Sequence, residues 1–359
     1  MWKNKRVGVL MGGFSAERDI SLRTGAGVVR ALQERGYDAF PVVLGPAPVD
    51  EAIRDADMDV AFLALHGRGG EDGCVQGVLE LFGIPYTGSN VLASALAMDK
   101  LKAKELFRLH NVPTPPYYSV EARTFLASKV KEELAMSLHG SFGFPAIVKP
   151  RREGSSVGVA KVANAKELVS ALEDAFRYDN NAIVERFIVA KEVHVGILDG
   201  VVLGSVEIAP KEGVYDFSAK YTAGKTDYFV PPRLEETRVS GAQRLAERAV
   251  SALGCTGAVR VDMLITEGEN EYVLEVNTLP GMTETSLLPK IARGQGIEYG
   301  PLCEQILSGA ELHQGIGKYG TTSIRSERRV RTSGVTLIGS HDEVAPESSD
   351  LFDRTGTDE

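Results

Sequence analysis

The sequence predicts an α/β protein, α+β overall, in which an N-terminal domain with a parallel sheet precedes two α+β subdomains. Three observations lead to this prediction. Over about the first hundred residues, short apolar runs alternate with helical patterns, which is typical of βαβ units and a parallel sheet. Later apolar runs follow one another through short turns, which indicates antiparallel strands. A stiff Pro-rich segment, residues 111–116, separates the two regions.

The N-terminal elements follow from where the apolar runs start and stop. Residues 7–10, 39–44 and 60–65 are predicted strands, residues 21–35 a helix closed by Gly36, and residues 89–98 and 100–110 two further helices. Ligands of parallel sheets bind beyond the carboxyl ends of the strands. The loops at those ends, residues 12–17 and 66–73, are therefore candidate ligand-contacting segments.

The later elements are read in the same way. Strands are predicted at residues 145–150 and 159–162, and Asn164 with Glu167 forms a near capping box for a helix that ends at Phe176. Three successive antiparallel strands are predicted at residues 182–187, 192–198 and 201–208. A helix ends at Gly254, and residues 259–265 and 272–276 form a predicted hairpin.

These elements divide the chain into four regions. The N-terminal domain covers residues 1–112, the central subdomain residues 113–210, the C-terminal subdomain residues 211–317, and a disordered tail residues 318–359. Residues 211–232 show no clear period, and loops of this length inside compact domains are usually functional lids or disordered.

Composition excludes several classes of protein. The chain has 359 residues, with 40 Lys and Arg against 49 Asp and Glu, and this charge of −9 argues against nucleic acid as a partner. No apolar run approaches the ~18 residues that span a membrane, and the short run near the start does not fit a signal peptide. We therefore expect a cytoplasmic protein without membrane contact. Three isolated cysteines, Cys74, Cys255 and Cys303, are expected to be buried, inert thiols.

The predicted hairpin carries the strongest chemical pattern. Because strand side chains alternate, Arg260 and Asp262 share one face, and Glu275 and Asn277 share a face of the partner strand. The apolar Tyr272, Leu274 and Val276 are expected on the opposite face. Clustered oxygen ligands suit Mg²⁺, especially Mg²⁺ shared with phosphates. The alternative is a solvated face with a salt bridge, but Asn277 runs directly into a Thr-Leu-Pro-Gly-Met turn that a plain surface strand does not need.

A second pattern begins where Lys149 closes an apolar strand. The loop that follows, residues 150–158, has two glycines and two serines, so its backbone N–H groups can surround phosphate oxygens. It lacks the order of a Walker A loop, and Gly12-Gly13 lacks the third glycine of a dinucleotide fingerprint. An ordinary hairpin turn is the alternative, but the metal-binding face downstream favours a nucleotide triphosphate.

Three single residues are ambiguous alone. Glu17 opens the first helix, where an acid is favoured by the helix dipole. His66 ends a buried strand, and Tyr221 lies in the long polar loop. Each has an ordinary structural interpretation.

Together, five segments resemble the D-alanine–D-alanine ligases of the ATP-grasp superfamily. They are MGGFSAERDIS at residues 11–21, LHGRGGEDGCVQG at 65–77, EGSSVG at 153–158, RVDM at 260–263 and EVNTLPGMTETS at 275–286. The likeness runs in order from about residue 5 to residue 309. It implies an ATP-grasp fold of two α+β subdomains after the N-terminal domain, and a homodimer in the cytoplasm.

The resemblance also implies roles in binding ATP. Lys100 and Lys149 would neutralise phosphate charge, and the segment with Glu185, Phe187 and Ile188 would line the adenine. The ribose would be held by Glu192. Two Mg²⁺ ions, or Mn²⁺ in their place, would be held by Asp262, Glu275 and Asn277.

The implied reaction joins two D-alanine molecules through a D-alanyl phosphate, for peptidoglycan precursors. The resemblance implies that Glu17 and His66 bind the first substrate, and that Arg260 and the N–H of Gly281 stabilise the oxyanion. Ser286 and Leu287 would position the second substrate. Ser155 and Tyr221, with Glu17, would close the loop over the site. Relatives that make D-alanyl-D-lactate have Phe in place of this Tyr221, so a dipeptide product is expected.

The sequence departs from the pattern of the ligase family at two places, and three alternative functions are open. Glu284 adds an acid beside the positioning serine, and Gly224-Lys225 lies in the predicted lid. Another ATP-grasp carboxylate–amine ligase, such as a D-Ala–D-Ser ligase, would share the metal-binding face but not the MGGFSAER and LHGRGGEDG segments. A decayed nucleotide-binding module is disfavoured because every candidate ligand is intact, and an oxidoreductase because the third glycine is missing.

Overall fold

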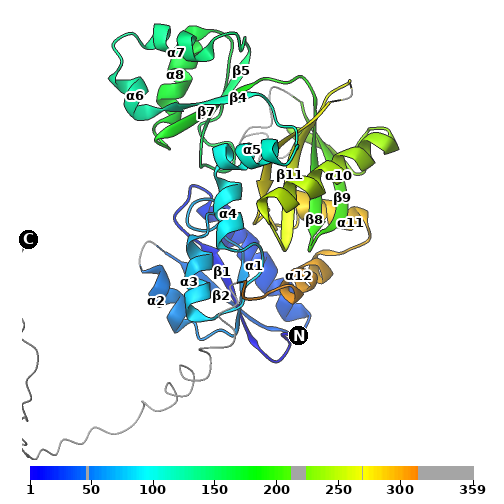
Figure 1. Cartoon of the computed structure of the whole chain (residues 1–359). Coiled ribbons are helices and arrows are strands. Elements are labelled where there is room, and N and C mark those ends of the chain that lie inside the picture. The colour runs from blue at the N-terminus through cyan, green and yellow to red at the C-terminus, as the bar shows by residue number, and fades with distance from the viewer. Residues whose placement is uncertain (46–47, 212–223, 269, 314–359) are drawn as a thin grey trace, which may run out of the picture. The chain divides into compact units, whose positions relative to one another are not determined.

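The computed structural model describes residues 1–45, 48–211, 224–268 and 270–313 (Figure 1). Tyr221 and the predicted tail lie outside these ranges. The described residues contain the predicted mixture of one parallel and two antiparallel sheets. No helix within these ranges is both long and apolar enough to cross a membrane.

The N-terminal sheet has the three predicted parallel strands, and their order is β2-β1-β3. Its strands are β1 (Arg6–Gly12), β2 (Asp38–Leu44) and β3 (Val60–Leu63), and its helices are α1 (Arg18–Glu34), α2 (Val49–Asp55) and α3 (Cys74–Phe82). After Arg6 every residue of β1 is buried, which explains its uninterrupted apolar run. The carboxyl ends of β1 and β3 open onto the loops that contain Glu17 and His66.

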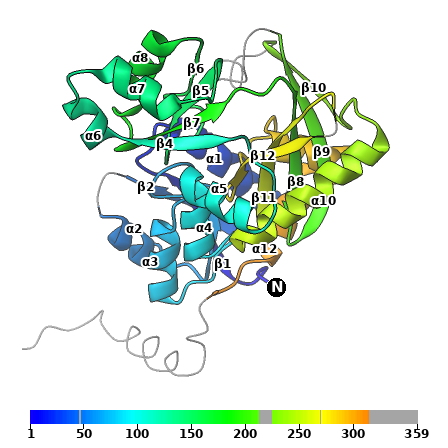
Figure 2. The same ribbon diagram turned by 45° about the horizontal axis from the view of Figure 1, so that its top comes forward.

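The central sheet has four antiparallel strands in the order β4-β7-β5-β6. Its elements are β4 (Tyr117–Glu121), β5 (Ala146–Pro150), β6 (Ala160–Val162), β7 (Asn181–Arg186), α6 (Ala122–Ala127), α7 (Lys131–His139) and α8 (Ala165–Ala175). The three helices cover one face of the sheet, where Phe125, Leu168 and Leu172 are fully buried (Figure 2). At the start of α8 the side chain of Asn164 accepts a hydrogen bond from the backbone N–H of Glu167, as the capping pattern predicted.

The third sheet has five antiparallel strands in the order β10-β9-β8-β11-β12. Its strands are β8 (Lys191–Leu198), β9 (Val201–Pro210), β10 (Thr226–Phe229), β11 (Ala258–Ile265) and β12 (Glu271–Asn277). The helices around it are α4 (Val91–Met98), α5 (Lys100–Leu109), α10 (Glu236–Leu253), α11 (Leu287–Gly294) and α12 (Tyr299–Ser308). The sheet begins at Lys191, so β8 and β9, which precede the expected boundary at residue 210, belong with β11 and β12.

One predicted strand pairing was wrong. β8 and β9 form the expected antiparallel pair, but β7 lies in the four-stranded sheet and β8 in the five-stranded sheet. The connecting residues 187–190 are Phe-Ile-Val-Ala, which lack the Gly, Asn or Asp of a tight hairpin turn. They carry the chain from one sheet to the other, and the backbone N–H of Phe187 still donates to Pro145 beside β5.

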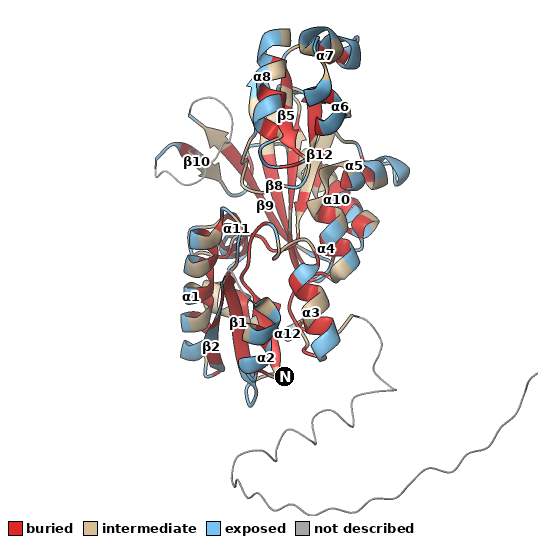
Figure 3. Cartoon of the chain, turned by 90° about the vertical axis from the view of Figure 1, so that its left-hand side faces the viewer, coloured by how far each residue is buried: buried red, intermediate tan, exposed pale blue. Residues whose placement is uncertain are grey.

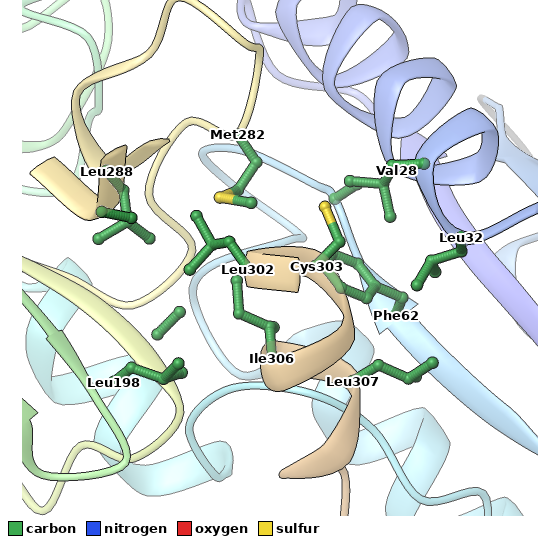
Figure 4. Packing of buried hydrophobic residues seen from close by; sticks show 14 of the residues in the cluster. Val28, Leu32, Phe62, Leu198, Met282, Leu288, Leu302, Cys303, Ile306 and Leu307 are labelled. Carbon is green, nitrogen blue, oxygen red and sulfur yellow. The ribbon is translucent and has the colours of Figure 1, made fainter. Parts of the chain in front are cut away.

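Two apolar cores cover the two faces of the five-stranded sheet (Figure 3). Helices α4, α5 and α10 pack on one face, over Val195, Val261 and Met263. On the other face, Leu302, Cys303 and Ile306 of α12 lie among side chains from this sheet and from the N-terminal domain, including Val28 and Phe62 (Figure 4). The N-terminal domain and the five-stranded sheet therefore share one continuous core, which brings the ends of β1 and β3 close to the segment between β12 and α11.

The cysteine prediction was correct for two residues and wrong for one. Cys255 and Cys303 are buried, but Cys74 is exposed. Cys74 is the first residue of α3, and the buried face of that helix starts with its neighbour Val75. Partial burial and the Asp72 carboxylate still raise the pKa of the Cys74 thiol to about 11, so the thiol is protonated and unreactive at neutral pH.

Candidate active site

The larger of two cavities at the site is a cleft of about 500 Å³ between the four-stranded and five-stranded sheets. All six residues that the resemblance assigns to nucleotide binding line it: Lys100, Lys149, Glu185, Phe187, Ile188 and Glu192. Asp262 and Glu275 line the same cleft. The ring of Phe187 lies 3.7 Å from the ammonium nitrogen of Lys161, and the Glu192 carboxylate lies 2.8 Å from the Nε2 atom of His194.

A buried charge triad lies at the back of this cleft. The Glu185 carboxylate lies 2.9 Å from Lys149 Nζ and 3.0 Å from Lys104 Nζ, and the Lys104 side chain is fully buried. Burial raises the pKa of Glu185, but the two lysines outweigh it and lower that pKa to about 2. Burial would lower the pKa of Lys149, yet Glu185 and Glu275 raise it. Lys104 was not predicted as a site residue.

The hairpin of β11 and β12 presents the predicted polar face. Asp262 is opposite Glu275 in the register, and Arg260 opposite Asn277. Arg260 donates to both Asp262 oxygens, at 2.7 and 2.9 Å, and the Asn277 amide donates to Asp262 at 3.2 Å. Lys100 Nζ lies 3.5 Å from the Glu275 carboxylate. The strands therefore bring two carboxylates, an amide and two cations together.

The alternation expected along β12 fails for Leu274, and also for Tyr272, which is opposite the cleft-lining Leu264 in the register. The register shifts between Asp262 and Met263, so β12 carries one extra residue there. Because of this bulge, Val273 and Val276 are in the core, while Leu274 lines the cleft with Glu275. The placement of Leu274 on the opposite face was therefore wrong.

The donor set of this face fits divalent cations shared with phosphates. Within residues 1–313 and outside their undescribed gaps, no three His, Cys, Asp or Glu side chains are grouped to hold a metal alone. Asp262, Glu275 and Asn277 supply hard oxygen atoms at the edge of a cleft that also holds Lys100 and Lys149. Mg²⁺ typically takes one or two carboxylates and completes its shell with phosphate and water oxygens.

The smaller cavity, of about 130 Å³, adjoins the cleft. It is lined by all the described residues that the resemblance assigns to substrates and chemistry: Glu17, His66, Ser155, Arg260, Gly281, Ser286 and Leu287. The predicted metal ligand Asn277 lines it as well. Gly154 and Glu275 line both cavities. The two cavities therefore meet between the predicted phosphate loop and the predicted metal-binding face.

Direct contact joins the phosphate loop to the first helix. Ser155 donates a hydrogen bond to the Glu17 carboxylate, although 138 positions separate them in the sequence. A Cβ atom on Gly154 would lie 2.5 Å from the Glu17 Oε2 atom, so a larger residue at this position would displace the Glu17 carboxylate. Of the expected network of Glu17, Ser155 and Tyr221, the contact between Glu17 and Ser155 is present. Tyr221 lies outside the described residues.

Comparisons with known proteins agree with this arrangement. A family model described as "D-ala D-ala ligase C-terminus" matches residues 106–308, and one described as "D-ala D-ala ligase N-terminus" matches residues 47–89. A D-alanine–D-alanine ligase of Geobacter sulfurreducens is 52% identical over 311 residues, 86% of this chain and 95% of that protein. This chain belongs to the D-alanine–D-alanine ligase family.

Solved structures of the ligase family have the same fold. A D-alanine–D-alanine ligase from Bacillus anthracis complexed with ATP matches with a TM-score of 0.72 and 37% identity, over 84% of this chain and 95% of that chain. The VanG D-Ala:D-Ser ligase from Enterococcus faecalis matches with a TM-score of 0.72 and 29% identity, over 85% and 98%. The prediction of an ATP-grasp ligase fold is thereby confirmed.

The loop between β3 and α3 carries two titratable groups, His66 and Glu71, whose pKa values are shifted by burial. His66 is buried, with Nδ1 3.1 Å from the Leu279 carbonyl oxygen and Nε2 3.3 Å from the Thr24 hydroxyl, and burial lowers its pKa. Glu71 also lines the smaller cavity and accepts a hydrogen bond from Gly67 N–H at 2.6 Å. Burial and then the Glu17 charge raise the pKa of Glu71 to about 8. Glu71 was missed as a site residue, although its position beyond the end of β3 pointed to it.

The loop before α11 forms the other wall of the smaller cavity. Ser286 Oγ accepts a hydrogen bond from Thr283 N–H at 3.1 Å and lies 2.7 Å from the Thr283 hydroxyl. Glu284, the acid noted as a departure, binds Arg30 of α1 at 2.5 Å. The loop thus holds Ser286 from within, while Glu284 ties it to the first helix.

Proposed function

We propose that this chain joins two D-alanine molecules at the expense of ATP, giving D-alanyl-D-alanine, ADP and phosphate for peptidoglycan precursors. The observation that carries the proposal is the meeting of the two cavities at Gly154 and Glu275. A cleft that places Lys100 and Lys149 beside carboxylates able to hold Mg²⁺ suits ATP, and it adjoins a small pocket whose Glu17 carboxylate suits an ammonium group. The relative from Geobacter sulfurreducens and the solved structure from Bacillus anthracis bear this activity in their names, whereas VanG is named a D-Ala:D-Ser ligase.

In the first step, a carboxylate oxygen of the first D-alanine attacks the γ-phosphorus. The bond from that phosphorus to the bridging oxygen breaks, and ADP leaves. Glu17 binds the ammonium group of this substrate, while Lys100 and Lys149 offset the negative charge of the phosphates. Asp262, Glu275 and Asn277 would hold the Mg²⁺ ions, which would offset the negative charge that develops on the phosphates.

In the second step, the amine of the second D-alanine attacks the acyl phosphate carbonyl. The new C–N bond forms, the nitrogen loses its proton, and the C–O bond to phosphate breaks. Arg260 and the backbone N–H of Gly281 stabilise the oxyanion of the tetrahedral intermediate. Ser286 and Leu287 position the second substrate. Ser155, bound to Glu17, helps to exclude the water that would hydrolyse the acyl phosphate.

A direct assay tests this function. The purified chain is incubated with MgATP and D-alanine alone, or with D-alanine plus D-serine or D-lactate, and phosphate release and product mass are measured. We expect one phosphate per D-alanyl-D-alanine, with little mixed product. Dominant D-alanyl-D-serine would move the chain to the alternative D-Ala–D-Ser class, and dominant ester would contradict the Tyr221 argument.

The proposal includes a homodimer in the cytoplasm, and light scattering tests the dimer.

Replacing Lys104 with methionine should weaken ATP binding without unfolding the protein. Two lysines and Glu185 give the triad a net positive charge, and without Lys104 the carboxylate would neutralise Lys149 alone. We expect KM for ATP to rise about tenfold, the scale of one partly screened charge, with KM for D-alanine unchanged. Burial lowers the pKa of Lys104 to about 8, so wild-type ATP affinity should fall above that pH and the variant should lack this fall.

The matched control is Lys102→Met on the same helix. Lys102 is exposed and pairs with Glu105 at 2.7 Å, away from the cleft. Its replacement should leave KM for ATP as in the wild type. Equal KM values for the Lys104 and Lys102 variants would refute the role given to the triad.

A further inference from the structure

We propose that Arg68 is a positioning residue that holds the phosphate loop closed over the substrate pocket. The phosphate loop is residues 153–158, and Arg68 belongs to the loop between β3 and α3 that also carries His66 and Glu71. The proposal rests on the proposed function, because its consequence is protection of an acyl phosphate. None of the motif-derived roles includes Arg68.

Arg68 reaches from the N-terminal domain to four groups beside the phosphate loop. Its Nε atom lies 2.6 Å from the Glu153 carboxylate and donates to the Arg152 carbonyl oxygen at 3.3 Å. Its Nη2 atom donates to the Tyr178 carbonyl oxygen at 2.6 Å and lies 3.5 Å from the Asp179 carboxylate. The planar fork of a guanidinium can serve several acceptors at once, which one ammonium group cannot do in the same way.

These acceptors are themselves fixed. The Asp179 side chain is fully buried and binds the Arg152 guanidinium through two hydrogen bonds of 3.0 Å. It also accepts hydrogen bonds from the backbone N–H groups of Arg152 and Asn181. Arg68 therefore binds a rigid base in the central subdomain, unlike an ordinary exposed ion pair between two flexible side chains.

The same contacts extend to the nucleotide cleft. The backbone carbonyl oxygen of Glu153 accepts a hydrogen bond from Lys100 Nζ at 2.6 Å. Glu153 thus binds Arg68 through its side chain and Lys100 through its backbone. The next two residues, Gly154 and Ser155, lie against Glu17. Loss of Arg68 would free the start of the loop from the N-terminal domain and let water enter between the two cavities.

The test uses Arg68→Ala and Arg68→Lys, with Arg177→Ala as the matched control. Arg177 is an exposed arginine next to Tyr178 that pairs with Asp174 at 3.3 Å. Phosphate released per dipeptide and KM for D-alanine are measured, together with hydrogen exchange of the 153–158 amides in ligand-free protein. For Arg68→Ala we expect excess phosphate and about tenfold rises in KM and exchange, the scale of a lost charged hydrogen bond. In Arg68→Lys the excess phosphate, the KM for D-alanine and the exchange should stay as high as in Arg68→Ala. Arg177→Ala should match the wild type.

The outcomes separate this inference from the proposed function. A wild-type enzyme that makes no dipeptide refutes the proposed function, whereas the exchange measurement still reports on Arg68. If the wild type releases one phosphate per dipeptide, and the 153–158 amides exchange in Arg68→Ala as they do in the wild type, only the inference about Arg68 is overturned. Release of one phosphate per dipeptide by Arg68→Lys also overturns the inference, because the planar guanidinium would then be unnecessary. A melting curve checks that each variant is folded.

Discussion

Glu275→Gln should nearly abolish dipeptide synthesis while the protein stays folded. Glu275 lines both cavities, is opposite Asp262 in the strand pair and lies 3.5 Å from Lys100 Nζ. The amide keeps the shape of the side chain but removes the negative charge that a cation needs, so kcat should fall by at least about a hundredfold. Steady-state phosphate release with MgATP and D-alanine measures the loss, and thermal unfolding checks the fold.

The matched control lies on the same strand. Glu271 pairs with Arg238 at 3.0 Å and does not line either cavity. Glu271→Gln removes the same charge from β12, and its kcat should stay within about twofold, since surface pairs contribute little. Near-normal turnover in Glu275→Gln would mean that the hairpin does not hold the metal.

The predictable part of the site is the part that local sequence determines. Strands β1 and β3 of the N-terminal sheet are buried on both faces, so their apolar runs identified them and the loops at their carboxyl ends. Along β11, alternation correctly placed Arg260 and Asp262 on one face. Along β12 it placed Glu275 and Asn277 correctly but failed for Leu274 and Tyr272, because the residue inserted at the bulge reverses the alternation on the other side of it.

The residues that sequence reasoning missed depend on partners far away in the chain. Lys104 reads as one of several charges on an amphipathic helix, and only the arrival of β7 buries it against Glu185. Arg68 looks like a polar loop residue until Glu153 and Tyr178 are placed beside it. The split of β7 and β8 between two sheets has the same origin, because strand pairing is decided by which apolar faces meet. Burial and long-range pairing are tertiary properties that no local pattern contains.

Arg260→Lys should uncouple the two chemical steps. Arg260 lines the smaller cavity and binds both oxygens of Asp262 through its guanidinium, with 13% of its side chain exposed. Lysine keeps the positive charge but cannot form the two-pronged contact while facing an oxyanion. Loss of one oxyanion donor costs about a hundredfold to a thousandfold in kcat. The acyl phosphate should still form, so phosphate release should exceed dipeptide formation.

The phosphate-to-dipeptide ratio distinguishes two roles for this arginine. If Arg260 acted only by holding Asp262 for the metal ions, both products would fall in parallel, because the first step would fail with the second. Excess phosphate indicates that phosphoryl transfer survives and that attack of the amine is impaired. Arg238→Lys is the matched control, since Arg238 of α10 binds Glu271 of the same hairpin at 3.0 Å and lies outside both cavities. That variant should keep one phosphate per dipeptide, which ties any uncoupling to the position of Arg260 rather than to a weakened hairpin.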